Sequence, residues 1–253
     1  MYVLTASLEK TIIPSFDCLK SIVGTDEKVI TMLKKSTIVL RINHERKLAP
    51  KLAILHALGV PDSVVAKLLV SHPRMFTISS ARFNEIVAQV KKMEFDPCQY
   101  TFLAAIQALT ALSIASLEAK FDLYRSWGWS EDEIRRAFRK APTCMLISKE
   151  SIMSKMNCLV KKFGFAASYI AKQPSVLTYS YKRRIVPRCS VMQVLIKSGQ
   201  LKKAPTLCTF LTMSEEMFLM KYLTRFEKEI PELKNVYLRK IKVKGIDHGS
   251  SVV

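Results

Sequence analysis

Apolar residues recur along the chain with the period of an α-helix. They stand three or four positions apart in several segments, so that each segment has one apolar and one polar face. The clearest stripes are Phe83, Ile86, Val90 and Met93; Ile152, Met156, Leu159 and Phe163; and Ile185, Cys189, Met192 and Ile196. The 253 residues include only 7 glycines and 10 prolines, few for the many turns of an all-β protein. The pattern therefore predicts an all-α protein.

Short breaks between these segments carry a repeated proline motif. Pro73, Pro142 and Pro174 are each followed three residues later by a large apolar side chain and six residues later by a serine. The apolar residues are Phe76, Met145 and Leu177, and the serines are Ser79, Ser148 and Ser180. Because proline disfavours helix in the residue before it, each motif predicts a tight turn between two helices. The apolar residue of the motif is expected to fold back into the core.

The motif recurs in weaker copies at a regular spacing. Thr37 and Gln107 stand in the position of the proline, and Pro205 with Cys208 forms a last copy. The six anchors, at 37, 73, 107, 142, 174 and 205, are 31 to 36 residues apart. A period of this length in a helical pattern predicts an α-solenoid, in which each unit stacks on its neighbours.

Glycines fall at the ends of the units on nearly the same period. They are Gly24, Gly59, Gly128, Gly164 and Gly199, with Phe95 filling the gap in the series. Glycine just past a helix supplies the left-handed residue that ends it. Signals for a helix start follow, such as the capping box of Ser130 and Glu133. Each unit is therefore expected to consist of a helix, a proline-bearing turn, a second helix and a glycine.

One stretch, residues 97–117, has no charged residue and is long enough to span a bilayer. It contains six polar residues, among them Gln99 and Gln107, and it follows Asp96, a helix-start signal. We therefore expect a buried helix of a soluble protein here, and the transmembrane helix is the alternative. No membrane association is predicted.

The charge balance favours a polyanionic partner. Forty Lys and Arg residues stand against 21 Asp and Glu residues, giving a formal net charge of +19, and the pI is about 9.8. Such an excess bears on association rather than on fold, and it points to nucleic acid before a membrane surface. The four histidines and six cysteines form no metal-ligand spacing, and no phosphate loop or nucleophile elbow is present. We predict no enzyme activity, no metal and no cofactor.

Several segments resemble the mitochondrial transcription termination factor (mTERF) family, especially its land-plant branch. They are the three proline motifs, "LGVPDSVVAKLLVSHPRMF" (58–76), "YKRRIVPRCSVMQVL" (181–195) and "SEEMFLMKYLTRFEKEIPELKNVY" (214–237). The resemblance implies a right-handed α-solenoid of three-helix repeats, in which a short 3₁₀-like helix carries the proline. It implies a curved half-ring with a basic concave face that binds nucleic acid. It also implies work in mitochondria or chloroplasts, in transcription termination, other control of expression, or RNA maturation.

The resemblance sets the expected domain organisation. Residues 1–237 are expected to form the repeat array, and residues 238–253 a basic, disordered tail. Pro14 matches Pro50 and Pro187, which lie 13 residues after their anchors, so the first repeat is expected to be incomplete. A targeting segment and one or two repeats are expected to be absent from the chain.

Basic residues recur beside the apolar stripes of the second helices. We expect a ladder of nucleic-acid contacts formed by Arg46, Lys47, Lys51, Arg82, Lys120, Lys155, Arg183, Arg184 and Arg188. Equivalent helices of a stacked array lie side by side, so such cations can follow a phosphate backbone. Arg184 and Arg188 are four residues apart and share a face, while Arg183 points away from it. The alternative is a solvated basic face without a ligand.

Two functions remain open. The first is a regulator that binds double-stranded DNA or RNA as a monomer in the mitochondrion, or alternatively in the chloroplast. The second is a helical scaffold that binds protein and no nucleic acid, which predicts apolar or aromatic anchors on its concave face. The charge excess favours the first.

Overall fold

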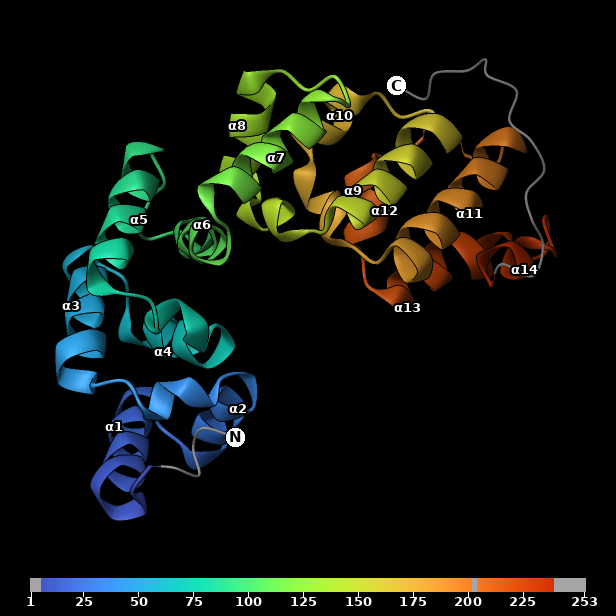
Figure 1. Ribbon diagram of the computed structural model, residues 1–253. Coiled ribbons are helices and arrows are strands. Elements are labelled where there is room, and N and C mark those ends of the chain that lie inside the picture. Colours follow the sequence, from blue (N-terminus) through green and yellow to red (C-terminus); the bar gives the residue numbers. More distant parts are fainter. Residues whose placement is uncertain (1–5, 202–203, 239–253) are drawn as a thin grey trace. The chain divides into compact units, whose positions relative to one another are not determined.

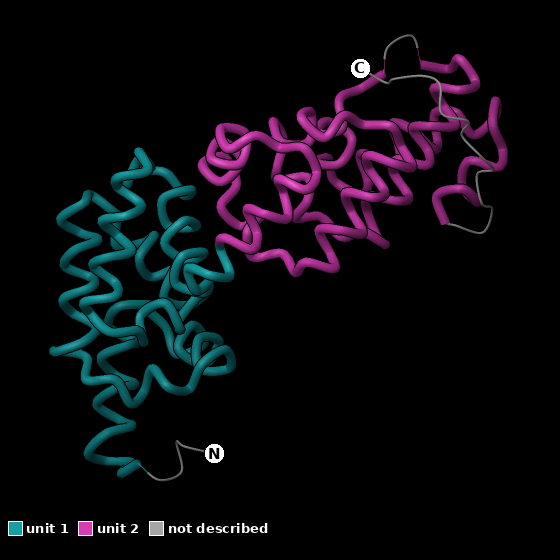
Figure 2. The backbone as a smooth tube through the Cα atoms, turned by 45° about the horizontal axis from the view of Figure 1, so that its top comes forward, with its two compact units in different colours: residues 1–117 teal, residues 118–253 magenta. Residues whose placement is uncertain are grey.

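The computed structural model describes residues 6–201 and 204–238, and these residues form helices and no strand. The chain divides into two compact units, residues 1–117 and 118–253 (Figure 2). The predicted all-α repeat fold is confirmed for each unit taken by itself. The half-ring and its concave face stay predictions. The tail is predicted for residues 238–253, and residues 239–253 lie outside the described part of the chain.

The first unit contains α-helices α1–α6 together with short 3₁₀ and π segments (Figure 1). In chain order they are η2 (Leu8–Ile12), α1 (Ile13–Val23), α2 (Asp26–Lys35), η3 (Thr37–Leu40), η4 (His44–Leu48), α3 (Ala49–Ala57), α4 (Asp62–Ser71), η5 (Pro73–Phe76), α5 (Ser80–Lys92) and α6 (Tyr100–Ala111). Helix α7 (Ile114–Arg125) follows, and the division between the units falls within it.

The second unit continues the same alternation. Its elements are α8 (Glu131–Lys140), η6 (Pro142–Leu146), α9 (Lys149–Met156), η7 (Asn157–Lys162), α10 (Ala167–Lys172), η8 (Pro174–Thr178), η9 (Tyr181–Ile185), α11 (Val186–Lys197), α12 (Leu207–Thr212), α13 (Glu215–Phe218), η10 (Leu219–Leu223), η11 (Thr224–Phe226) and α14 (Leu233–Tyr237).

Equivalent elements of neighbouring repeats pack against each other. In the first unit α2 contacts α4, η3 contacts η5 and α3 contacts α5; in the second, α8 contacts α10 and η6 contacts η8. Pro73, Pro142 and Pro174 each begin a 3₁₀ helix. The three apolar residues of the motif, Phe76, Met145 and Leu177, are fully buried. The repeat period in the sequence is thus a stacking period in each unit.

The residue six positions after each of the first five anchors caps the second helix of the repeat. Its side-chain oxygen accepts a hydrogen bond from the backbone N–H three residues later, which satisfies a donor that the helix leaves unpaired. The caps are Asn43, Ser79, Ser113, Ser148 and Ser180. Ser214 caps α13 in the same way.

Two anchors assigned from the sequence are wrong in detail. Gln107 lies inside α6, which continues unbroken to Ala111, because glutamine keeps its N–H and has no ring to clash with the preceding turn. Pro205 precedes Thr206, the N-cap of α12, and begins no 3₁₀ helix. Leu207, the first residue of α12, is buried.

The charge-free stretch 97–117 contains α6 and the start of α7, and α6 is largely buried. In the described part of the chain, no single helix has the length and apolarity for a membrane span; α6 and α7 meet that test only as a pair joined at a sharp bend.

Prolines near the start of three second helices coincide with π-helical turns. Pro14, Pro50 and Pro187 are each the second residue of an α-helix that a π segment precedes. Proline has no N–H and its ring clashes with the carbonyl four residues earlier. A wider turn before it relieves both problems and adds one residue to the helix.

The helix ends use left-handed residues. Gly128 and Gly164 have φ values of 83° and 74°, which favour glycine. At the gap in the glycine series, Glu94 and not Phe95 takes this conformation, with a φ of 61°. The predicted capping box is present, because Ser130 and Glu133 each accept a hydrogen bond from the other's backbone N–H.

The substitution Gln107→Pro tests whether position 107 is helical. We expect it to lower the free energy of unfolding by about 3 kcal/mol or more, since it removes a helical hydrogen bond and clashes with the preceding turn. Gln107→Ala, which keeps the helix, is the control. Tolerance of the proline in denaturant unfolding would show that a turn, and not α6, occupies this position.

Candidate nucleic-acid interface

Three of the nine predicted contact residues are inside the protein. Lys51 and Arg188 are 0% exposed and Lys155 is 6% exposed. The prediction that these side chains line an open surface is therefore wrong for this structure. They sit on the apolar stripes because they face the next repeat, and their charged ends are bonded there to backbone carbonyls.

The lysines share one geometry. Lys51 Nζ donates hydrogen bonds to the carbonyls of Phe76 at 2.6 Å and Ile78 at 2.5 Å. Lys155 Nζ donates to the carbonyl of Leu177 at 2.6 Å. Lys120, which is half-buried, donates to the carbonyl of Ile147 in the same way. Each lysine of one repeat thus bonds to the segment that runs from the 3₁₀ turn of the next repeat to its N-cap.

Arg188 makes the equivalent contact in the last repeat. Its guanidinium donates to the carbonyls of Phe210 at 2.8 Å and Met213 at 2.7 Å, and to Glu215 Oε2 at 2.9 Å. It also lies over the ring of Phe218, 4.6 Å from the centroid. A buried cation with this many partners has its desolvation cost offset by charged hydrogen bonds.

We call Lys51, Lys120, Lys155 and Arg188 the inter-repeat cations. The last carbonyls of a helical turn have no partner within it, which is why each turn needs a donor. The inter-repeat cations lie seven residues after the N-cap of their helix, or eight where a π turn intervenes, as for Lys51 and Arg188. At the corresponding place in α5 stands Ile86, fully buried, and the next motif copy is the unbroken α6.

The first turn of the array is arranged differently. Ser15 occupies the donor position before η3. There His44 Nε2 lies 3.0 Å from the carbonyl of Val39.

Burial lowers the pKa of Lys51 to about 8, and the charge of Lys47 adds to the effect. Burial also lowers the pKa of Lys155 and, against the opposing charge of Glu150, that of Lys120. These directions agree with an interior position for Lys51 and Lys155 and with a half-buried position for Lys120.

Three of the predicted residues share a different position, at the start of the second helices. Arg46, Arg82 and Arg183 each lie three residues after the N-cap, and each backbone N–H donates to that cap. Arg46 and Arg183 are exposed. The Arg82 side chain is 34% exposed and pairs with Glu85 at 3.2 Å. We call these three residues the cap arginines.

The remaining predicted residues lie beside the cap arginines. Lys47 is exposed, whereas Arg184 is half-buried, over the ring of Tyr179 and 3.4 Å from the carbonyl of Leu211. The sequence argument placed Arg183 away from the shared face of Arg184 and Arg188. That face is turned toward the next repeat, so Arg183 is the residue that reaches solvent.

Sequence reasoning missed one exposed lysine at the same turns, Lys149. Its position directly after a capping serine is the signal that would have identified it. Lys182, two residues after Ser180, is likewise exposed. In the last repeat Glu215 and Glu216 occupy these places, so the cationic series ends there. Burial opposes ionisation of Glu215, but hydrogen bonds from Tyr237 and Arg188 outweigh it and lower its pKa.

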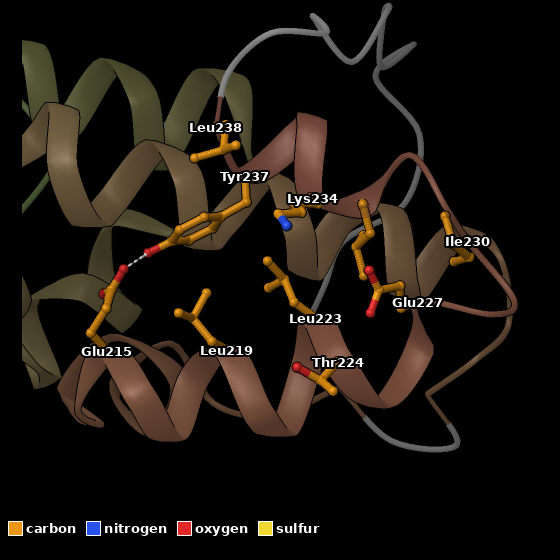
Figure 3. A pocket seen from close by; sticks show the side chains of 10 residues that line it. Glu215, Leu219, Leu223, Thr224, Glu227, Ile230, Lys234, Tyr237 and Leu238 are labelled. Atoms are coloured by element: carbon orange, nitrogen blue, oxygen red, sulfur yellow. Dashed lines mark hydrogen bonds between the residues drawn. The ribbon is translucent and has the colours of Figure 1, made fainter.

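A cavity of about 410 Å³ lies between η10 and α14. Figure 3 shows Leu219, Leu223 and Tyr237 around it, with the Tyr237 hydroxyl donating to Glu215. Its lining is largely apolar and includes none of the cap arginines. Among the described residues, no group of three or more His, Cys, Asp or Glu side chains could hold a metal ion.

Comparison with known proteins identifies related sequences. The model of the mTERF family matches residues 2–110 and 105–219. The chloroplastic transcription termination factor MTERF8 of Arabidopsis thaliana is 25% identical over 171 residues, which are 67% of this chain. The matched part covers 34% of that protein, so the chain spans about a third of the length of this relative.

Replacing Lys155 with methionine tests the bond between repeats. We expect Lys155→Met to destabilise the protein by about 1–3 kcal/mol, because the Leu177 carbonyl loses a charged donor inside the protein. Lys197→Met, at an exposed lysine, is the control, with a change within about 0.5 kcal/mol. Equal free energies of unfolding for the two variants would contradict the assignment.

The pH dependence of stability tests the burial of Lys51. Between pH 8 and the ordinary pKa of 10.5, the unfolded chain holds a proton on Lys51 that the folded chain has released. The contribution of Lys51 to the free energy of unfolding therefore rises with pH across this window and is constant below it. We expect the wild type to gain stability relative to Lys51→Met between pH 7.5 and pH 10 in denaturant unfolding. A pH-independent difference would indicate an ordinary, solvated lysine.

Proposed function

Since the chain belongs to the mTERF family, we propose that it binds nucleic acid in an organelle and regulates transcription there, including termination, or RNA maturation. The relative's name specifies transcription termination, which supports double-stranded DNA as the first ligand to test and RNA as the second. The protein is proposed to act without catalysis and without a cofactor.

The observation that carries the proposal is the shared register of the cap arginines. Arg46, Arg82 and Arg183 come from three repeats, yet each lies three residues after its N-cap. In the first unit η5 packs on η3, and α5 on α3, so Arg46 and Arg82 belong to neighbouring, equivalent helices. Cations at a fixed place in stacked repeats form a series that can follow a phosphate backbone.

The proposed binding surface of the first unit comprises Arg46, Arg82 and Lys47, and that of the second unit comprises Arg183, Lys149 and Lys182. Lysines at the opposite ends of the second helices, such as Lys91, Lys92 and Lys197, have another explanation. They lie in the last turns, where a positive charge interacts favourably with the helix dipole. The net charge of +19 supports either surface and does not choose between them.

The relative's name also bears on location. It specifies a chloroplastic protein, so we propose the chloroplast rather than the mitochondrion that the sequence argument preferred. Expression of the full gene product with a fluorescent tag in plant cells tests this. Signal confined to mitochondria would overturn the preference for the chloroplast.

Salt dependence distinguishes a nucleic-acid ligand from a protein ligand. If ~6–10 phosphates are neutralised, the logarithm of the association constant on duplex DNA should fall with the logarithm of the salt concentration with a slope of roughly −5 to −9. Titrations of labelled duplex DNA and single-stranded RNA by fluorescence anisotropy measure it. A flat dependence on both ligands would leave the protein-binding scaffold as the better function.

Matched charge removals locate the surface. The triple variant Arg46→Gln, Arg82→Gln, Arg183→Gln should reduce the magnitude of the salt slope by about 3, since each removed phosphate contact contributes about one unit. The control, Lys91→Gln, Lys92→Gln, Lys197→Gln, removes equal charge from the other ends of α5 and α11. A larger loss of affinity in the control variant would place the ligand at the C-terminal ends of α5 and α11 instead.

A further inference from the structure

We propose that two of the inter-repeat cations, Lys155 and Lys51, are positioning residues for nucleic-acid binding, each acting through the cap arginine of the next repeat. The proposal rests on the proposed function, because it concerns the surface that the cap arginines form. It replaces the direct phosphate contact that the sequence suggested for these lysines with an indirect role. The route runs through the backbone between the 3₁₀ turn and the N-cap.

The route from Lys155 is short. Its Nζ bonds to the carbonyl of Leu177, the fourth residue of η8. Three residues later comes Ser180, whose side chain caps the helix by accepting from the backbone N–H of Arg183. Lys155 therefore fixes one end of a segment of a few residues, and Arg183 is held at the other end.

Lys51 is connected to Arg82 in the same way, through a shorter stretch of backbone. It bonds to the carbonyls of Phe76 and Ile78. Ile78 directly precedes Ser79, which accepts from the backbone N–H of Arg82. Because Lys51 is fully buried, its side chain has little freedom, and the position of the carbonyls it binds is correspondingly defined.

Arg188 provides a contrasting case within the same chain. It bonds to the carbonyls of Met213 and Ser214, so its route also leads to an N-cap. The residues that follow are Glu215 and Glu216, which carry the charge opposite to that of the cap arginines. The positioning role is therefore assigned to Lys51 and Lys155, whose routes end at a cationic side chain.

The physical effect is preorganisation. A long arginine side chain pays conformational entropy when a phosphate immobilises it, and a helix start that also moves would add to that cost. When a buried cation already fixes the turn, binding no longer has to immobilise the helix start, and only the entropy of the arginine side chain is lost. Loss of the buried cation should thus weaken the phosphate contact of one arginine and leave distant contacts unchanged.

A double-mutant cycle tests this coupling. Affinity for duplex DNA is measured for wild type, Lys155→Met, Arg183→Gln and the double variant, at a temperature where circular dichroism shows all four folded. We expect Lys155→Met to weaken binding by at least about threefold in the wild type and to have almost no effect when Arg183 is already replaced. The matched control repeats Lys155→Met in the Arg46→Gln background, where the full loss should remain.

The second lysine gives an independent cycle in the other unit. Lys51→Met should lose its effect in the Arg82→Gln background and keep it in the Arg183→Gln background. Lys155→Arg, which retains a donor for the Leu177 carbonyl, should bind more tightly than Lys155→Met. If Lys155→Met does not fold, the Lys51 cycle and Lys155→Arg carry the test.

The two proposals fail in different ways. If Arg183→Gln and Arg82→Gln alone leave affinity unchanged, the proposed binding surface is wrong. If they weaken binding but the lysine variants do not, or weaken it equally in every background, the surface stands and the positioning role is overturned. Both proposals are supported if the effect of each lysine substitution disappears only in the background of its matched arginine substitution.

Discussion

The hydrogen bond from a buried cation to backbone carbonyls of the next repeat is the interaction on which this structure depends. A proline-bearing turn ends a helix and leaves carbonyl groups without partners, at a place where the next layer of side chains excludes water. Hydrophobic packing can fill that space but cannot satisfy those carbonyls. Lys51, Lys120, Lys155 and Arg188 do so, and each connects two adjacent repeats within its unit.

The need for a hydrogen-bond donor links the turn of each repeat to the second helix of the repeat before it. Where the proline is replaced by Gln107, the helix continues, no turn needs a donor, and the donor position is the apolar Ile86. Where the turn is present in the second unit, a cation stands at the matching place. The same segments lead directly into the N-caps. The interaction that connects neighbouring repeats therefore also fixes the helix starts that carry the cap arginines Arg82 and Arg183. Stability and the proposed nucleic-acid binding thus depend on the same part of the backbone.

Much of the fold could be predicted from the sequence, because its signals are local. Pro73, Pro142 and Pro174 mark turns by their own chemistry, and the serines six residues later mark helix starts. Gln107 was misplaced since a period alone does not show whether a helix ends. The site was harder, because a lysine side chain is long enough to reach either solvent or a neighbouring repeat. Lys155 stands three residues after Ile152 on an apolar stripe, which was the available sign of burial. Arg183 lies off the apolar stripe of its own helix, which begins at Ile185, and is exposed.

The measurement that tests the central claim most directly is native-state hydrogen exchange on wild type and Lys155→Met. If the buried cation holds the next repeat, amide exchange in Lys155→Met should be faster from Val176 to Arg184, where η8 leads into η9. Helix α14, which packs against α11, should keep its wild-type rates. Unchanged protection of residues 176–184, or a uniform increase throughout the second unit, would contradict a role for this bond in fixing that segment.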